Sequence, residues 1–377
     1  MSFVARILFS VSVLCALSVA LNASIIDGVL TVDGKNPRAI GLRSSDVSAA
    51  IASVFGGGAG AGNASQILKN SSSFYNYLEL TGSYDADAAI MLFPGLALVL
   101  SDATLTATTS SLPAPNALIA AVSAPWSAVV GRGVARLVCA PGGGSSAPDP
   151  IYAGQSTGFV LDGLQISDCG RVHFEGTPFV NGGEVANCVI SNSRGQAVWL
   201  EKISRAVVHG NTIFNASYHT IDADAFTSGA LIMNNTVSYS REEAVFLEQG
   251  SSNVVVVDND LGPGNSRGVG VFNNAIGALT SGHVIARNRI FGSLTSGVSV
   301  GSTAPRSGAP DSNVLVAGNK MWGNAGQGVH SNGGQLGTLY VANDDADGAS
   351  IYTLTGAGTA ANISFADPFD RVLAAKV

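Results

Sequence analysis

The sequence VVVVDNDL at residues 254–261 has a close counterpart in VLVAGNKM at residues 314–321. In both, an asparagine follows an alternating apolar run and precedes an apolar residue two places further on. The same phrase occurs at six asparagines: Asn187, Asn211, Asn235, Asn259, Asn288 and Asn319. The steps between them are 24, 24, 24, 29 and 31 residues. Self-similarity at a nearly fixed period of this length predicts a solenoid, with surplus loops in the last two steps.

Each repeat contains three short apolar strips. The first places an aliphatic residue three positions before the asparagine in five of the six copies: Val208, Ile232, Val256, Ile285 and Val316. The second places one two positions after it: Val189, Ile213, Val237, Leu261, Ile290 and Met321. The third alternates further along, as in Val198/Leu200, Ile221/Ala223, Val245/Leu247, Val269/Val271 and Val298/Val300. Two positions interrupt the apolar pattern, Glu184 and His283. Alternation with period two predicts strands rather than helices.

Three short strands per repeat, each pairing with the same strand of the next repeat, make one coil of a parallel β-helix. In-register stacking would bring successive asparagines to about one strand spacing, roughly 4.8 Å. Each side-chain amide can then donate to the carbonyl of its neighbour in a continuous ladder. The predicted fold class is therefore all-β, a parallel β-helix with three strands per coil and an asparagine ladder.

These residues resemble the right-handed parallel β-helix proteins of the pectin-lyase-like superfamily, whose repeat has the form V-x-I-x-x-N-x-I. The resemblance covers Phe159 to Asn332. It implies a right-handed coil, in agreement with the general preference of parallel crossovers. It leaves the reaction open, because this scaffold hosts lyases, hydrolases, epimerases and adhesins. The arginine motif of pectate lyases and the signatures of polygalacturonases are absent from the coils, and the run Tyr218–Asp224 is only loosely similar to a segment of mannuronan C5-epimerases.

The expected domain organisation is a secretory signal peptide followed by a single β-helix domain. Arg6 and the apolar stretch from Ile7 to Ala20 predict a signal that is cleaved after residue 20, and an uncleaved anchor is the alternative. The β-helix domain then spans residues 21–377, with irregular coils at 21–158, regular coils at 159–332 and a closing segment at 333–377. Asp46 to Val54 predicts a short helix that caps the first coil.

The composition agrees with a turn-rich extracellular protein. The chain has 46 glycines among 377 residues and a net charge of -7, which argues against a nucleic-acid partner. Removal of the signal would leave an odd number of cysteines, Cys139, Cys169 and Cys188, whose pairing the sequence does not decide. Asn-x-Ser/Thr sequences predict a glycoprotein if the chain enters a eukaryotic secretory route; they begin at Asn22, Asn63, Asn70, Asn215, Asn234 and Asn362.

Outward positions of the third strand gather charged residues on neighbouring coils. Eight places after the asparagine stand His219, Glu243 and Arg267, whereas Gln196 is one residue out of phase. The next outward columns contain Trp199, Asp222 and Phe246, and then Glu201, Asp224 and Glu248. Tyr218 and Arg241 lie at the turn edge. Carboxylates one strand spacing apart repel one another unless a proton, a cation or an arginine compensates. The patch therefore predicts a substrate groove, and an ordinary solvated charged face is the alternative.

For a uronate polymer, the chemistry expected on this scaffold is abstraction of the proton next to the carboxylate, followed by elimination or by reprotonation from the other face. The candidate catalytic residues are His219 as base, Tyr218 as acid, and Asp222, Glu243 and Arg267. The candidate substrate-binding residues are Trp199, Phe246 and Arg241. Asp224, Glu201 and Glu248 are candidate ligands of Ca²⁺, and no organic cofactor is expected.

The sequence thus favours a secreted or cell-wall protein, a monomer, that acts on a polysaccharide as a lyase or C5-epimerase. A non-catalytic carbohydrate-binding, adhesion or structural matrix protein is the alternative. Neither a nucleic acid nor, once the signal is removed, a membrane is an expected partner.

Overall fold

The computed structural model describes residues 76–140, 147–176, 180–272, 280–301, 313–331, 338–341 and 343–345, together with the strands at 23–26, 29–32, 352–354 and 363–366. The predicted signal peptide and capping helix lie outside these residues. The chain divides into two compact units, Met1–Cys169 and Gly170–Val377. No helix in the described part of the chain is long and apolar enough to cross a membrane.

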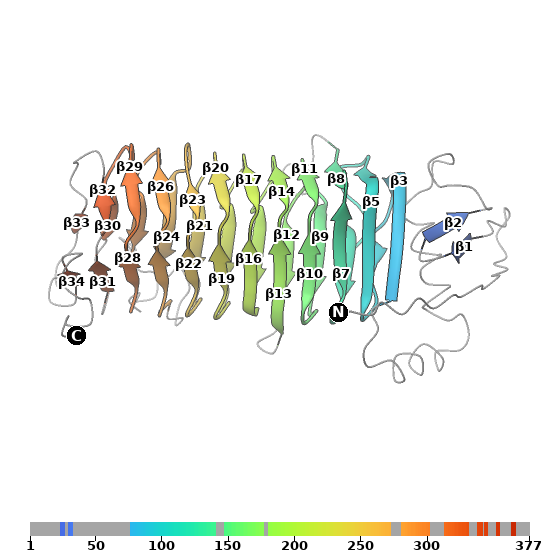
Figure 1. The fold of residues 1–377 in the computed structure, drawn as a ribbon, viewed down its shortest axis with the longest axis horizontal. Helices are drawn as coiled ribbons and strands as arrows, with labels where there is room; N and C mark the ends of the chain where they lie inside the picture. The colour runs from blue at the N-terminus through green and yellow to red at the C-terminus, as the bar shows by residue number, and fades with distance from the viewer. Residues whose placement is uncertain are drawn as a thin grey trace. The chain divides into compact units, whose positions relative to one another are not determined.

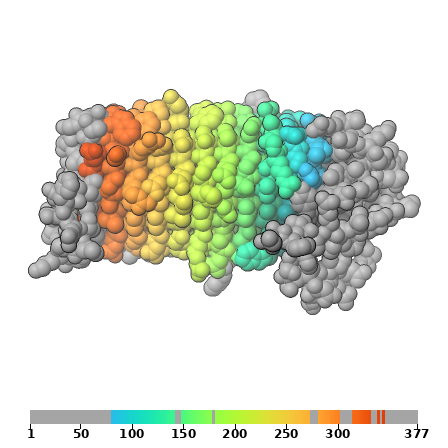
Figure 2. Space-filling view, in the orientation of Figure 1, coloured from blue at the N-terminus to red at the C-terminus, as the bar shows by residue number. Residues whose placement is uncertain are grey.

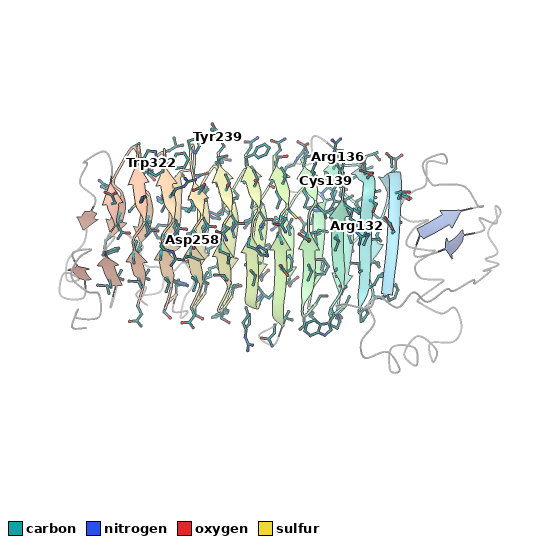
Figure 3. All side chains as sticks on the ribbon, in the orientation of Figure 1. Arg132, Arg136, Cys139, Tyr239, Asp258 and Trp322 are labelled. Atoms are coloured by element: carbon teal, nitrogen blue, oxygen red, sulfur yellow. A yellow bond between two sulfur atoms is a disulfide. The ribbon has the colours of Figure 1, made fainter. Side chains whose placement is uncertain are left out.

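The described part of the first unit is built from parallel strands, apart from the antiparallel pair β1 and β2. Its strands are β1 (Ala23–Ile26), β2 (Val29–Val32), β3 (Asn76–Ala86), β4 (Ile90–Met91), β5 (Leu96–Ala107), β6 (Ala117–Val122), β7 (Ala128–Arg132), β8 (Arg136–Cys139), β9 (Asp149–Gly154), β10 (Phe159–Asp162) and β11 (Gln165–Ser167). Cys139, labelled in Figure 3, forms a disulfide with Cys169 across a Cα–Cα distance of 4.8 Å. This pairing resolves the ambiguity left by the three cysteines, and Cys188 is a buried cysteine that keeps its thiol.

The second unit is a stack of three-stranded coils (Figure 1). The first strands of the coils are β13 (Asn181–Ala186), β16 (Ser204–His209), β19 (Leu231–Met233), β22 (Val255–Val257), β25 (Val284–Ala286), β28 (Leu315–Ala317), β31 (Thr338–Val341) and β34 (Ile363–Ala366). The second strands are β14 (Val189–Ser191), β17 (Thr212–Phe214), β20 (Thr236–Ser238), β23 (Asp260–Leu261), β26 (Arg289–Phe291), β29 (Lys320–Trp322) and β32 (Asp344–Asp345). The third strands are β12 (Val172–Glu175), β15 (Val198–Glu201), β18 (Ile221–Asp224), β21 (Glu243–Glu248), β24 (Arg267–Phe272), β27 (Val298–Val300), β30 (Val329–Ser331) and β33 (Tyr352–Leu354).

Successive coils pair in parallel and in register, as the repeat predicts. Val207 pairs with Leu231, and Leu231 pairs with Val255 in the next coil. Inward residues of the third strand are fully buried, for example Ile221 and Val245 at 0% exposure. In the space-filling view, the coils of this unit form consecutive bands of colour whose side chains are packed against one another (Figure 2). The core is therefore a column of stacked aliphatic side chains, and the prediction of a parallel β-helix is confirmed.

The asparagine ladder is present and runs from Asn211 to Asn343. The Nδ2 of Asn211 donates to Oδ1 of Asn235 at 2.9 Å, and Asn235 donates in the same way to Asn259 at 3.0 Å. The same bond continues through Asn288 and Asn319 to Asn343. These amides also donate to backbone carbonyls, as Asn235 does to Val208 at 2.9 Å. The ladder thus supplies hydrogen bonds to polar groups at the bend between the first and second strands of these coils.

The assignment of Asn187 to this ladder is wrong. Asn187 is exposed, and the buried Cys188 occupies the ladder position, since its backbone N–H donates to Oδ1 of Asn211 at 2.9 Å. The strand after it is shifted accordingly, because Val189 pairs with the exposed Thr212 and is itself 41% exposed. A shift of one residue exchanges the two faces of a strand, so Ile190 points inward where Val189 was expected.

Candidate functional site

The candidate site lies on the outward face of β18, β21 and β24, the third strands of three successive coils. Parallel pairing in register places Glu243 beside Arg267, and Asp222 between Trp199 and Phe246. The predicted stacking of these columns is therefore observed. A pocket of about 210 Å³ opens on this face; its lining residues are Tyr218, His219, Glu242, Glu243, Phe246, Glu248, Arg267 and Phe272.

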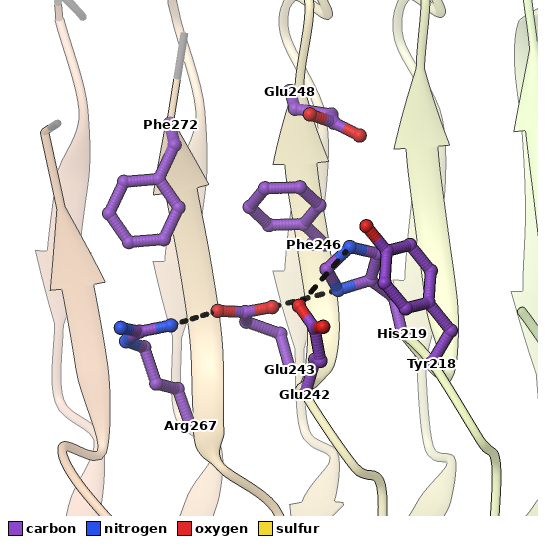
Figure 4. A pocket seen from close by; sticks show the side chains of 8 residues that line it. All are labelled: Tyr218, His219, Glu242, Glu243, Phe246, Glu248, Arg267 and Phe272. Carbon is purple, nitrogen blue, oxygen red and sulfur yellow. Dashed lines mark hydrogen bonds and ion pairs between the residues drawn. The ribbon is translucent and has the colours of Figure 1, made fainter. Parts of the chain in front are cut away.

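The side chains of Arg267, Glu243 and His219 form a continuous chain of polar contacts across the pocket (Figure 4). An Nη1 of Arg267 donates to Oε1 of Glu243. The other oxygen of Glu243, Oε2, lies 2.7 Å from Nδ1 of His219. Burial alone would raise the pKa of Glu243, but the contacts with His219 and Arg267 lower it below its ordinary value. Glu243 is therefore a carboxylate near neutral pH, held between a histidine and an arginine.

His219 is enclosed by aromatic rings. Its imidazole stacks on Phe246, with ring centroids 4.2 Å apart, and lies 4.1 Å from the ring of Tyr218. Because Nδ1 faces Glu243, Nε2 is the nitrogen left for a substrate, and Oε2 of Glu242 lies 3.9 Å from it. This distance is too long for a hydrogen bond. The contact between Nδ1 and Glu243 therefore fixes the orientation of the imidazole ring and leaves Nε2 available as a base.

These residues do not form a solvated charged face. Asp222 is 0% exposed, Glu243 is 2% exposed and His219 is 3% exposed. An outward position in the repeat therefore does not leave His219 exposed to solvent. It does point away from the core, but the rings on neighbouring positions cover it, because strand spacing brings large outward side chains into contact.

Asp222 is the most buried acid of the site. One of its oxygens, Oδ2, accepts a hydrogen bond from Nε2 of Gln196 at 3.3 Å, and Oδ1 has no hydrogen-bond partner among the described residues. Burial, followed by the negative charges of Glu248 and Asp224, raises the pKa of Asp222 well above its ordinary value. This shift favours the protonated form of Asp222, in which the carboxyl group can donate a hydrogen bond.

A second cluster lies one coil away on the N-terminal side, around Trp199. The indole N–H of Trp199 donates to Oδ2 of Asp224 at 3.2 Å, and its ring stacks on His173 with centroids 4.2 Å apart. The guanidinium of Arg171 lies 4.7 Å from the ring centre. Glu201 forms an ion pair with Lys202 and lies 3.6 Å from His173. Trp199 and Asp224 therefore belong to this flank and not to the pocket.

The three predicted Ca²⁺ ligands are not brought together. Asp224 accepts hydrogen bonds from Trp199 and from the backbone of Ala225, Glu201 pairs with Lys202, and only Glu248 lines the pocket. Among the described residues, the groups of three ligand-type side chains whose donor atoms lie within 4.8 Å of one another are His219–Glu242–Glu243 and His219–Asp222–Glu248. Both contain an imidazole nitrogen, whereas Ca²⁺ prefers oxygen ligands alone.

The structure also places residues that the sequence argument left out. Glu242 and Phe272 line the pocket, and His173 stacks on Trp199. Phe272 occupies the same outward position of the repeat as Glu248, so the repeat pattern predicts where it lies. Glu242 sits at the turn edge, where alternation no longer tells which way a side chain points. Arg241 is exposed and does not line the pocket, and Phe246 lies under the site with 4% exposure.

Comparisons with known proteins agree with this fold. The family model described as a right-handed β-helix region matches residues 145–278. Comparison with curated proteins gave no match. The match, the parallel coils and the ladder together show that the chain has the right-handed parallel β-helix fold.

Several solved structures share the fold at low sequence identity. A polygalacturonase from Erwinia carotovora ssp. carotovora has a TM-score of 0.53 and 13% identity over 80% of this chain and 93% of its own. The A-module of the mannuronan C-5 epimerase AlgE6 from Azotobacter vinelandii has a TM-score of 0.50 and 14% identity over 77% of this chain and 86% of its own. A tailspike protein of E. coli bacteriophage HK620 has a TM-score of 0.55 and 10% identity over 81% of this chain and 62% of its own. The chain also spans 61% of a periplasmic alginate epimerase, with a TM-score of 0.45, 14% identity and 71% of this chain covered.

Proposed function

We propose that this protein acts outside the cytoplasm on an acidic polysaccharide, as a lyase or C5-epimerase, with His219 as the catalytic base. The observation that carries the proposal is the Arg267–Glu243–His219 chain. Nδ1 of His219 lies 2.7 Å from the Glu243 carboxylate, so the tautomer with its proton on Nδ1 is favoured and the lone pair of Nε2 is free. A base oriented in this way by a buried carboxylate is a recurrent arrangement for proton transfer.

The positions of the pocket side chains indicate the steps of the proposed reaction. Nε2 of His219 takes the proton from the carbon next to the uronate carboxylate. The electron pair left on that carbon can expel the glycosidic oxygen, which then takes a proton, and an unsaturated sugar results. Alternatively, the carbanion takes a proton back on the opposite face, which inverts the centre. Tyr218 can supply either proton from the rim of the pocket, since its side chain is half-exposed and burial, followed by the charge of Glu242, raises its pKa.

Abstraction of the proton moves negative charge onto the substrate carboxylate, and a hydrogen-bond donor there lowers the barrier. Arg267 lines the pocket and is the candidate for this role on the described face. Trp199 and Arg171, one coil away, offer a flank against which the next part of the polymer can lie.

The test is product analysis with matched histidine variants. The protein is incubated with a panel of uronate polymers, unsaturated product is followed by absorbance, and inversion is followed by NMR. The His219→Gln variant should lose at least about 100-fold in turnover, because a positioned general base contributes on this order. His209→Gln is the control: His209 contacts Glu184 outside the pocket. Full activity of His219→Gln would remove His219 from the mechanism.

Hydrolysis of a less acidic glycan is a second candidate, favoured by the charge of the pocket. The pocket is lined by three glutamates, Glu242, Glu243 and Glu248, and Arg267 is the one arginine or lysine among its described lining residues. An anionic sugar is therefore repelled by this pocket, whereas a neutral sugar is not. Two nearby carboxyl groups with separated pKa values are what glycoside hydrolysis requires. New reducing ends without unsaturated product would identify this reaction. Binding without any product would identify a carbohydrate-binding module.

A further inference from the structure

Three side chains of ligand type converge behind the pocket from two neighbouring strands. His219 precedes β18, Asp222 lies on β18, and Glu248 ends β21. One donor atom of each lies within 4.8 Å of the other two. All three residues are buried, with exposures of 3%, 0% and 7%. Groups of this kind away from water need a proton or a cation to balance them.

One oxygen of Asp222 lacks a partner. Its Oδ2 accepts from Gln196 at 3.3 Å, whereas Oδ1 is buried and has no hydrogen-bond partner among the described residues. An unpaired buried carboxyl oxygen is destabilising relative to a paired one, because the loss of its hydration is not compensated. A bound cation would remove this cost.

His219 is oriented as a metal ligand usually is. Its Nδ1 lies 2.7 Å from Glu243, which Arg267 holds from the other side, so that Nε2 remains for a ligand bond. Metal-ligating histidines commonly direct their second ring nitrogen to a carboxylate in this way, because the contact fixes the tautomer and raises ligand basicity. Glu242, whose Oε2 lies 3.9 Å from Nε2, offers a further oxygen on the solvent side.

We propose that His219 Nε2, Asp222 and Glu248 form a binding site for a divalent transition-metal ion of the Zn²⁺ class. One imidazole nitrogen and two carboxylates suit Zn²⁺, whereas Ca²⁺ and Mg²⁺ prefer oxygen alone and more ligands than these residues supply. The inference does not rest on the proposed function. If His219 is also the base, the metal occupies the lone pair that would take the proton, so Zn²⁺ should inhibit turnover.

The site is tested by calorimetric titration of Zn²⁺ into the tag-free full chain, with Ca²⁺ and Mg²⁺ titrated in parallel. We expect one Zn²⁺ site at least about 10-fold tighter than any Ca²⁺ site. Asp222→Asn and Glu248→Gln should each weaken Zn²⁺ binding by at least about 10-fold, since each removes a charged ligand while keeping the shape of the side chain. His209→Ala is the matched control, because it removes a half-buried imidazole that lies 2.7 Å from another glutamate, Glu184.

Each outcome of the titration either supports or overturns the proposed Zn²⁺ site. Absence of Zn²⁺ binding, unchanged affinity in Glu248→Gln, or loss of the site in His209→Ala would each overturn the proposal. If Asp222→Asn does not fold, Glu248→Gln decides alone. The readout needs no substrate, so a failed metal site and a failed catalytic assignment are distinguished: the first changes the titration and the second changes only turnover.

Discussion

At the scale of single residues, the asparagine ladder explains why a polar side chain recurs inside an apolar coil. Asn235 donates to Asn259, to Val208 and to Met233, and its Oδ1 accepts from both the backbone and the side chain of Asn211. Each of these groups is buried or nearly so, and leucine would leave its partners without a hydrogen bond.

We therefore expect Asn235→Leu to lower the free energy of unfolding by about 3 kcal/mol, because several buried donors and acceptors lose their partner at once. Urea unfolding of the variant measures this. The control is Thr236→Val, one position further on and exposed. An unchanged midpoint in Asn235→Leu would mean that the ladder bonds contribute little.

His283 is a buried histidine in a column of aliphatic residues. It is 0% exposed, and its Nδ1 accepts the backbone N–H of Val254 at 3.2 Å. Burial lowers the pKa of His283 to about 4. Between this value and the ordinary histidine pKa of about 6.5, the unfolded chain binds a proton that the folded chain does not. The stability that this difference in pKa contributes is fully present above about pH 6.5 and is lost as the pH falls toward about 4.

The expected size of this effect is roughly 3 kcal/mol, from the difference between the two pKa values. Unfolding free energies measured from neutral pH down to about pH 4 should therefore fall less steeply in His283→Val than in the natural chain. His209→Ala, which removes a half-buried surface histidine, should keep most of the natural slope. Equal slopes in the natural chain and His283→Val would show that His283 is not the group that titrates.

At the scale of strands and coils, most of the architecture was predictable, because the residues that recur in the repeat are those that stacked coils require. The aliphatic strips and the asparagines fix strand order, register and the inward face, as Ile221 and Val245 show. The prediction failed at Asn187, where Asn187 and Cys188 stand side by side and only pairing with the next coil decides which of them enters the ladder. The same shift explains why Gln196 was out of phase, since it stands eight places after Cys188.

The candidate site was predictable in position and less so in detail. Register alone brings His219, Asp222, Glu243 and Arg267 to one face. It does not reveal that Glu243 pairs with both His219 and Arg267, nor that Phe246 covers the imidazole, because these contacts depend on rotamers. The disulfide could not be predicted for a related reason: Cys139 lies before the regular coils predicted at 159–332, so the repeat does not place it beside Cys169.

Gly270 on β24 is the element-scale feature that makes room for the pocket. A Cβ at this position would lie 2.8 Å from Cγ of Glu243, 2.9 Å from Phe272 and 3.0 Å from Phe246. These distances are shorter than carbon–carbon contact, so the three side chains would have to move. We expect Gly270→Ala to reduce turnover, and Zn²⁺ affinity, by at least about 10-fold while the coil remains folded.

Circular dichroism and activity measured on the same samples check this expectation. The control is Gly195→Ala, whose added Cβ would meet only the flexible side chain of Arg171, at 3.2 Å. Natural activity in Gly270→Ala would show that the pocket tolerates a displaced Glu243.

At the scale of the whole molecule, the prediction of export remains to be tested. The apolar stretch from Ile7 to Ala20 predicts cleavage after residue 20, and mass spectrometry of the secreted protein should find a chain that begins at residue 21. Replacing Leu14→Arg and Leu17→Arg together should abolish secretion, because the apolar run is what the export machinery recognises. Replacement of the same residues by isoleucine is the control, and a secreted chain that retains Met1 would contradict the prediction.

The disulfide is in keeping with an extracellular protein. Disulfides persist in oxidising compartments and are rare in the cytosol. Cys139–Cys169 closes a loop whose ends are 30 residues apart in sequence. In the chain-entropy account, closing a loop of this length restricts the unfolded ensemble and so stabilises the fold by roughly 3.6 kcal/mol.

The ladder of the second unit has a direction. From Asn211 to Asn343 the side-chain bonds all run the same way, from the amide nitrogen of one coil to the carbonyl oxygen of the coil that follows it in sequence. The amide dipoles therefore add along the stack, in the manner of peptide dipoles along a helix, and each bond polarises the next. A chain that emerges from the ribosome completes its coils in this order, and the newest coil always offers an unused N–H. Each finished coil therefore presents the positive end of its asparagine amide dipole to the coil that forms next. The carbonyl oxygen of the following asparagine is attracted to that end.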